Sequence, residues 1–196
     1  MKQLTGIAAL CILAALWTGC ASTTQSHFYT LSPAAKSAAA AASYSISVGP
    51  VTIPAAVDRP QIVVRVGPNQ VNIDEFNRWA SPLQSDIARV VAENLALMLG
   101  TPDVTVFPQT TAASASYRVV ISVLRFDSMP GGEATLDAVW TAREAKGDQS
   151  RTGRTMLSVQ TQGSGYAPLV AAHSLALEKL SSEVAEAIRT MENTGK

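Results

Sequence analysis

YRVVISVLRFDSMPGGEATLDAVWTAR, residues 117–143, contains two strand patterns on either side of a Pro-Gly-Gly turn. Residues 117–126 are apolar on both faces for much of their length, which is typical of a central strand. Residues 133–143 alternate instead, which predicts one buried face and one mostly exposed face. The stretch therefore predicts an antiparallel pair inside a sheet. The side chains expected to point inward from the second strand are Ala134, Leu136, Ala138, Trp140 and Ala142.

Further strand patterns lie on both sides of this pair. RTGRTMLSVQTQ (151–162) follows a Gly-Asp turn and is more polar, which predicts the edge of the sheet. Towards the amino end, YSISV (44–48) alternates, Gly-Pro interrupts it, and VTI (51–53) resumes the strand. QIVVRV (61–66), Gly-Pro-Asn and QVNI (70–73) are typical of a β-hairpin.

Two amphipathic helices are expected. Ser81 can cap the first, Pro82 suits the first helical position, and Gln84 completes a capping box. Gly100 and Pro102 end that helix. A second helix is expected over residues 168–190. Its apolar face consists of Leu169, His173, Leu177, Leu180, Val184 and Ile188.

The order of the elements decides the expected fold class. Strands, a helix, three more strands and a second helix predict an α/β fold. The expected architecture is a two-layer sandwich, with a mixed, mostly antiparallel sheet and two amphipathic helices packed on one face. We expect residues 44–196 to form this single domain, and its mature length suits one domain.

The amino end has the layout of a bacterial lipoprotein signal. The apolar run of residues 7–17 is too short to span a bilayer but has the length of a secretory signal. Two small residues then precede Cys20. We expect residues 1–19 to be a lipoprotein signal peptide and Cys20 to become the acylated first residue of the mature chain. Several acyl chains would hold the protein firmly on its membrane.

An ordinary secretory signal is the alternative, with Cys20 as a free thiol or an interchain disulfide partner. The only other cysteine, Cys11, lies in the removed segment, so the mature chain can form no internal disulfide. Ala21, rather than Asp, follows the cysteine, which favours the outer membrane as the destination. Residues 20–43 are expected to form the acylated N-terminus and a flexible tether with a short strand at 27–31.

Composition and motifs argue against several functions. Without residues 1–19 the chain has 14 basic and 15 acidic residues, a balance that does not favour nucleic-acid binding. Only 15% of the whole chain is charged, which hints at a surface covered by a partner. His173 has no His or Cys at ligand spacing, so we expect a core or interface histidine rather than a metal ligand. We expect Asp74 and Glu75 to lie in a solvated loop, and we expect no cofactor and no catalytic site.

FNRWASPL (76–83) offers a candidate binding motif just before the first helix. Trp79 could pack back on the first turn and fix the angle at which the chain enters the helix. Alternatively, Trp79 and Arg78 could anchor a partner, since Trp and Arg are favoured at binding hot spots. Packing is the preferred interpretation because buried aromatic side chains are common.

Three segments carry a resemblance to a known family: YTL (29–31), PVTIPAAVDRPQIVVR (50–65) and NRWASPLQSDIARVVAENL (77–95). The chain resembles the PqiC-like lipoproteins, the auxiliary lipoprotein component of ABC-type and MCE-type transport systems. The sharpest motifs contain Arg59, Arg78 and Trp79, which are the candidate partner-binding residues.

The resemblance implies a non-catalytic outer-membrane lipoprotein that faces the periplasm. Its implied partners are an MCE-domain protein and an inner-membrane transporter that together move lipid between the membranes, and identical subunits could form a ring. The protein would dock the conduit at the outer membrane, to which acyl chains on Cys20 attach it. The alternative is a structural or assembly lipoprotein that binds another envelope protein or a polysaccharide.

Overall fold

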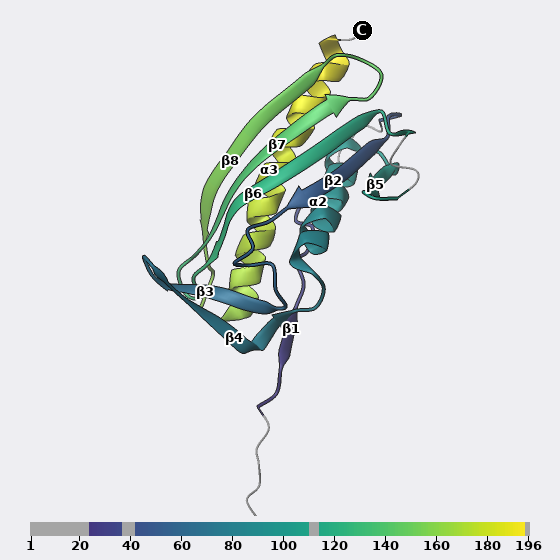
Figure 1. Ribbon diagram of the computed structural model, residues 1–196. Helices are drawn as coiled ribbons and strands as arrows, with labels where there is room; N and C mark the ends of the chain where they lie inside the picture. The colour runs from purple at the N-terminus through teal and green to yellow at the C-terminus, as the bar shows by residue number, and fades with distance from the viewer. Residues whose placement is uncertain (1–23, 37–41, 110–113, 195–196) are drawn as a thin grey trace, which may run out of the picture.

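A curved five-stranded sheet carries two helices on one face, and a smaller three-stranded sheet lies at one end of the molecule (Figure 1). The computed structural model describes residues 24–36, 42–109 and 114–194. Their elements are β1 (His27–Tyr29), β2 (Ile46–Thr52), β3 (Gln61–Gly67), β4 (Gln70–Trp79), α2 (Leu83–Leu99), β5 (Val104–Val106), β6 (Tyr117–Ser128), β7 (Glu133–Glu144), β8 (Ser150–Gln160) and α3 (Tyr166–Thr194). The expected α/β fold class is confirmed.

The larger sheet has the strand order β5-β2-β6-β7-β8. The predicted meander is confirmed, because β6, β7 and β8 pair antiparallel and β8 forms one edge. Strand β2 pairs parallel with both β5 and β6, so the sheet is mixed. It continues through Gly49 and Pro50, with a shift in register, where the sequence suggested an interruption.

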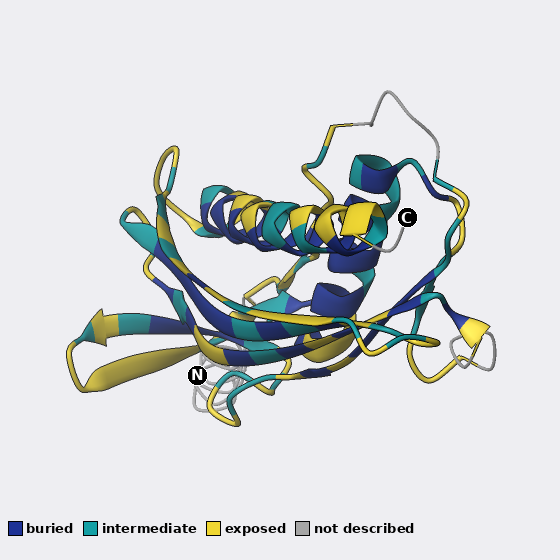
Figure 2. Cartoon of the chain, turned by 90° about the horizontal axis from the view of Figure 1, so that it is seen from above, coloured by how far each residue is buried: buried dark blue, intermediate teal, exposed yellow. Residues whose placement is uncertain are grey.

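Both helices cover the same face of the larger sheet (Figure 2). Helix α2 packs against β2 and β5, and α3 packs against β7 and β8. The expected inner face of α3 is fully buried, from Leu169 to Ile188. The capping box expected at Ser81 is wrong: the N-cap position is Pro82, and no side chain caps the helix. Gln84 instead donates a hydrogen bond to the carbonyl of Val51 and so joins α2 to β2.

The predicted hairpin belongs to a separate sheet with the order β1-β4-β3, whereas the sequence suggested one sheet. Strand β4 extends to Trp79, so Asp74 and Glu75 lie in a strand, not in the expected loop. Asp74 accepts hydrogen bonds from the backbone N–H groups of Phe76 and Asn77, both at 2.9 Å. These bonds stabilise a bulge, across which the register with β3 shifts.

Residues 30–35, here called the strap, cross the two helices. Leu31, the last residue of the short strand expected over residues 27–31, is 1% exposed, and its N–H donates to Asp86 Oδ2 at 2.8 Å. Arg89 pairs with Asp86 at 2.6 Å and donates to the carbonyl of Leu31 at 2.7 Å. Further along the strap, Asn94 Oδ1 accepts hydrogen bonds from two backbone N–H groups.

The strap follows β1, which pairs parallel with β4, so the short strand expected over residues 27–31 is confirmed for its first three residues. The start of β1 lies at the end of the molecule that carries the hairpin, and α3 ends at the opposite end (Figure 1). Cys20 and the expected signal peptide lie outside the described residues.

Candidate partner-binding site

A pocket of about 390 Å³ gathers two of the three residues that the sequence singled out for partner binding. Arg59 comes from the loop before β3, and Trp79 is the last residue of β4. The two segments meet because the N–H of Trp79 donates to the carbonyl of Pro60 at 2.7 Å. The pocket is lined by Asp58, Arg59, Pro60, Trp79, Ala80, Ser81 and Pro82.

Arg59 supplies the cationic side chain of this pocket. Its Nε atom is buried and has no hydrogen-bond partner, and no ion pair to its guanidinium occurs among the described residues. Asp58 lies next to it on the rim and is exposed. An unpaired guanidinium beside apolar and proline side chains can bind a carboxylate or phosphate of a partner.

Trp79 is mainly a core residue. It is 6% exposed, and its ring meets the ring of Phe126 edge to face at a centroid distance of 6.3 Å. This placement agrees with the packing interpretation, although the ring packs against β6 and forms only one wall of the pocket. Its backbone, more than its side chain, positions the loop that carries Arg59.

Arg78 lies apart from the pocket. Adjacent residues of a strand point to opposite faces, so Arg78 faces outward where Trp79 faces the core. It pairs in register with Phe28 of β1 and Gln61 of β3. Its contact with Glu75, at 3.9 Å, is a long ion pair between partly exposed groups and contributes little to stability.

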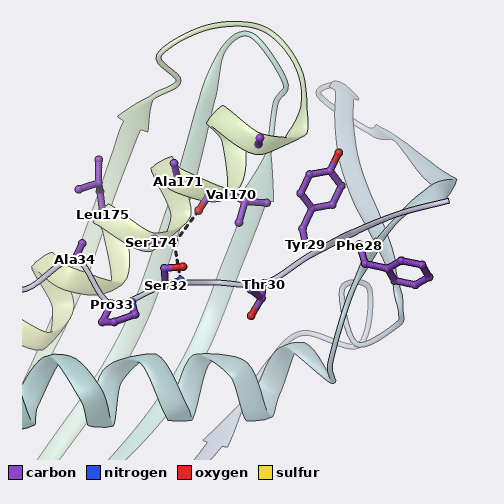
Figure 3. A pocket seen from close by; sticks show the side chains of 11 residues that line it. Phe28, Tyr29, Thr30, Ser32, Pro33, Ala34, Val170, Ala171, Ser174 and Leu175 are labelled. Carbon is purple, nitrogen blue, oxygen red and sulfur yellow. Dashed lines mark hydrogen bonds between the residues drawn. The ribbon is translucent and has the colours of Figure 1, made fainter. Parts of the chain in front are cut away.

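The sequence analysis missed a second hollow, a groove of about 500 Å³ between the strap and α3. Figure 3 shows Pro33 and Ala34 on the side of the strap and Val170, Ala171 and Leu175 on the side of α3. Ser174 offers no free polar group there, because it donates to the carbonyl of Val170 and accepts from the N–H of Ser32. The groove can therefore bind a partner mainly through apolar contact. Apolar residues outside the buried face of α3, such as Leu175, were the only sign of this groove in the sequence. Helical periodicity alone did not show that they are exposed rather than part of the core.

His173 is a core histidine. It is completely buried, stacks on Phe126 at a centroid distance of 3.9 Å, and its Nε2 lies 2.8 Å from Ser128 Oγ. Burial lowers its pKa to about 3, so the ring is neutral at physiological pH. No group of three or more His, Cys, Asp or Glu side chains that could hold a metal ion occurs in the part of the chain that the structure describes.

Asp74, considered above as a solvated carboxylate, has a structural contact. The hydroxyl of Tyr166, at the start of α3, donates to Asp74 Oδ2 at 2.6 Å. Burial opposes ionisation of this carboxyl group, but hydrogen bonds from Tyr166 and from two backbone N–H groups outweigh burial and lower its pKa. The contact joins the smaller sheet to α3.

Within the described ranges, neither helix is long and apolar enough to cross a membrane.

Comparison with solved structures confirms the fold. One crystal structure, of an uncharacterized protein, matches with a TM-score of 0.67 and 19% identity, over 84% of this chain and 99% of that chain. Protein XCC0632 from Xanthomonas campestris, described as a DUF330 protein, matches with a TM-score of 0.69 and 17% identity, over 87% of this chain and 100% of that chain. No curated protein matches the chain.

The family model described as the ABC-type transport auxiliary lipoprotein component matches residues 29–185. The match begins at the end of β1 and runs into α3, so it includes both sheets, the strap and the pocket beside Arg59. It also agrees with the resemblance carried by the segments around Arg59 and Trp79. The chain belongs to the family of ABC-type transport auxiliary lipoprotein components.

Proposed function

We propose that this chain is a non-catalytic outer-membrane lipoprotein, which docks the conduit of an MCE/ABC-type lipid transport system at the outer membrane. The match of the family model over residues 29–185 is the observation that carries this proposal. In the proposed arrangement, acyl chains on Cys20 hold the protein on the membrane, and the folded domain faces the periplasm. An MCE-domain protein and an inner-membrane transporter are the proposed partners.

The segment between the proposed anchor, Cys20, and the first strand is short. Seven residues lead from Cys20 to His27, the first residue of β1. An extended chain of this length spans at most about 25 Å. The domain would therefore remain close to its membrane, with the end that carries β1 and the hairpin nearest the anchor.

The pocket beside Arg59 is the proposed contact with the MCE-domain partner. Its unpaired guanidinium and the proline-lined rim offer one charged and several apolar contacts. Trp79 supports the pocket from the core, and Arg78 would contact a different surface. The low share of charged residues, 15% of the chain, is compatible with identical subunits packed side by side in a ring.

Cys20→Ala tests the anchor. We expect the variant to lose its acyl chains and to leave the outer-membrane fraction, with an unchanged melting temperature, because Cys20 lies seven residues before β1, the first strand of the fold. Mass analysis of the wild-type mature chain should find an acylated N-terminus at Cys20. A variant that still fractionates with the outer membrane would contradict the proposed anchor.

Arg59→Ala tests the partner site. We expect co-purification of the MCE-domain protein from membranes to fall about tenfold, since loss of a hot-spot arginine costs more than about 1.4 kcal/mol. Arg151→Ala is the matched control, because Arg151 is exposed on the edge strand β8, outside this pocket. Trp79→Ala is unsuitable, since removing a buried Trp lowers stability by about 3–5 kcal/mol whatever it binds. Equal co-purification of the Arg59 and Arg151 variants would refute the site. Capture of a different envelope protein alone would favour an assembly lipoprotein.

A further inference from the structure

The three-stranded sheet exposes an unusual number of apolar side chains. Five of the eleven large hydrophobic side chains that are exposed among the described residues belong to β1, β3 and β4. A cluster of this kind on a folded domain marks a binding surface more often than isolated exposed residues do. The five residues and their exposed fractions are Phe28 (63%), Val66 (58%), Val71 (49%), Ile73 (39%) and Phe76 (44%).

The strand register places most of this cluster on one face. Ile73 pairs with Val63 and Val71 pairs with Arg65, and paired residues share a face of the sheet. Phe28 pairs with Arg78, which points away from the core side occupied by Trp79. We call this side the outer face. The opposite side carries Ile62 and Val64, which are buried in the core.

The outer face combines apolar side chains with guanidinium groups. Glu75 places a carboxylate beside Arg78 and accepts a hydrogen bond from Gln61 Nε2 at 3.1 Å. Arg78 lies between Phe28 and Gln61, and its distant pairing with Glu75 leaves the guanidinium available for another anion. Arg65, by contrast, is paired with Asp127 at 3.1 Å. Aromatic and aliphatic side chains beside an arginine suit the boundary between lipid headgroups and acyl chains.

The position of the anchor identifies the occupant of this face. β1 is an edge strand of the sheet, and its first residue lies seven residues after Cys20. The outer face thus lies within about 25 Å of the proposed acyl chains along the chain. Figure 1 shows β1, β3 and β4 gathered at this end, away from the end of α3. A membrane is the one partner that the anchor would hold there permanently.

We infer that the outer face of the three-stranded sheet rests on the membrane that holds the acylated Cys20. Phe28, Val71 and Ile73 enter the headgroup boundary, and Arg78 contacts lipid phosphate. This inference rests on the proposed function, since it requires the acyl anchor. It adds an orientation: the domain does not move freely at the end of a tether but lies with one sheet on the lipid.

Fluorescence quenching tests this orientation in the full-length mature protein. The mature chain has no cysteine besides Cys20, whose sulfur is acylated in the proposed protein, so Ile73→Cys provides a single site for an environment-sensitive dye. Met156→Cys is the matched control, because Met156 is an apolar side chain, 67% exposed, on the far edge strand β8. The labelled proteins are reconstituted in vesicles of phosphatidylethanolamine and phosphatidylglycerol that contain spin-labelled lipid as the quencher.

We expect the dye at position 73 to be quenched at least about threefold more than the dye at position 156, with a blue-shifted emission. Equal quenching at the two positions, in protein that floats with the vesicles, would overturn the orientation and leave the anchor intact. A dye at position 73 that is shielded only at high protein concentration, and not quenched by lipid, would show that a second copy covers the face. Wild-type protein that does not float with vesicles would refute the anchor, and the orientation with it.

Discussion

His173 makes the stability of this protein depend on pH in a window where few other groups titrate. The ring is fully buried between Phe126 and Ser128, and burial lowers its pKa from 6.5 to about 3. The unfolded chain therefore binds a proton near pH 6.5 that the folded chain does not bind until about pH 3. Stability from this residue is fully present above pH 6.5 and declines as the pH falls towards about 3.

The size of the effect follows from these two pKa values. Between about pH 7.5 and about pH 4.5, protonation of the unfolded chain at His173 should lower the free energy of unfolding by about 2.7 kcal/mol. Carboxyl groups titrate mostly below this window and contribute little to the difference. A loss of this size is a large fraction of the stability of a typical domain.

Urea denaturation of wild type and His173→Gln at both pH values measures this contribution. Glutamine can still form a hydrogen bond with Ser128 but does not titrate, so the variant should be less stable at high pH and lose much less on acidification. His27→Gln is the matched control, because it makes the same substitution at an exposed histidine on β1. The reasoning is refuted if wild type and His173→Gln lose the same free energy, or if NMR shows that folded His173 titrates near pH 6.5.

Two further substitutions test the packing. Asp86→Ala leaves a buried N–H of the strap without its acceptor, and should lower the free energy of unfolding by about 2–3 kcal/mol. Asp148→Ala, at an exposed turn, is the control for Asp86→Ala. Equal melting temperatures of these two variants would contradict the conclusion that the docked strap stabilises the fold. Gly153→Ala would place a Cβ atom 2.3 Å from the indole of Trp140 and should cost about 1–3 kcal/mol by thermal melting. Gly67→Ala is the control, because its new Cβ atom would lie 3.7 Å from Gln70, an ordinary contact, and the melting temperature should hardly change. Similar losses of stability in the two variants would contradict the proposed clash with Trp140.

Local patterns were enough to predict the meander, the hairpin and both helices. The inward residues of β7 and the apolar face of α3 are buried as expected, because alternation and helical spacing each report which side chains face a core. Asp137 shows the limit of this reasoning: it was expected to be outward but is 4% exposed, because Arg154 of β8 pairs with it at 2.7 Å.

The candidate site was predictable only in part. The motifs around Arg59 and Trp79 were recognised from the sequence, but their meeting at one pocket depends on the pairing of β3 with the end of β4. The groove beside the strap could not be predicted at all. It exists because residues 30–35 pack on helices that begin about 50 and 135 residues later.

The sequence by itself determined the elements, their amphipathic faces and the family, because each depends on residue types within a few positions of one another. Tertiary structure decided the rest: the division into two sheets, the docked strap, the separation of Arg78 from Arg59, and the apolar outer face beside β1. These features depend on contacts between segments far apart in the chain. Such contacts form cooperatively, when several buried polar groups and apolar faces pack at the same time. A local sequence pattern does not show which distant segments will pack together.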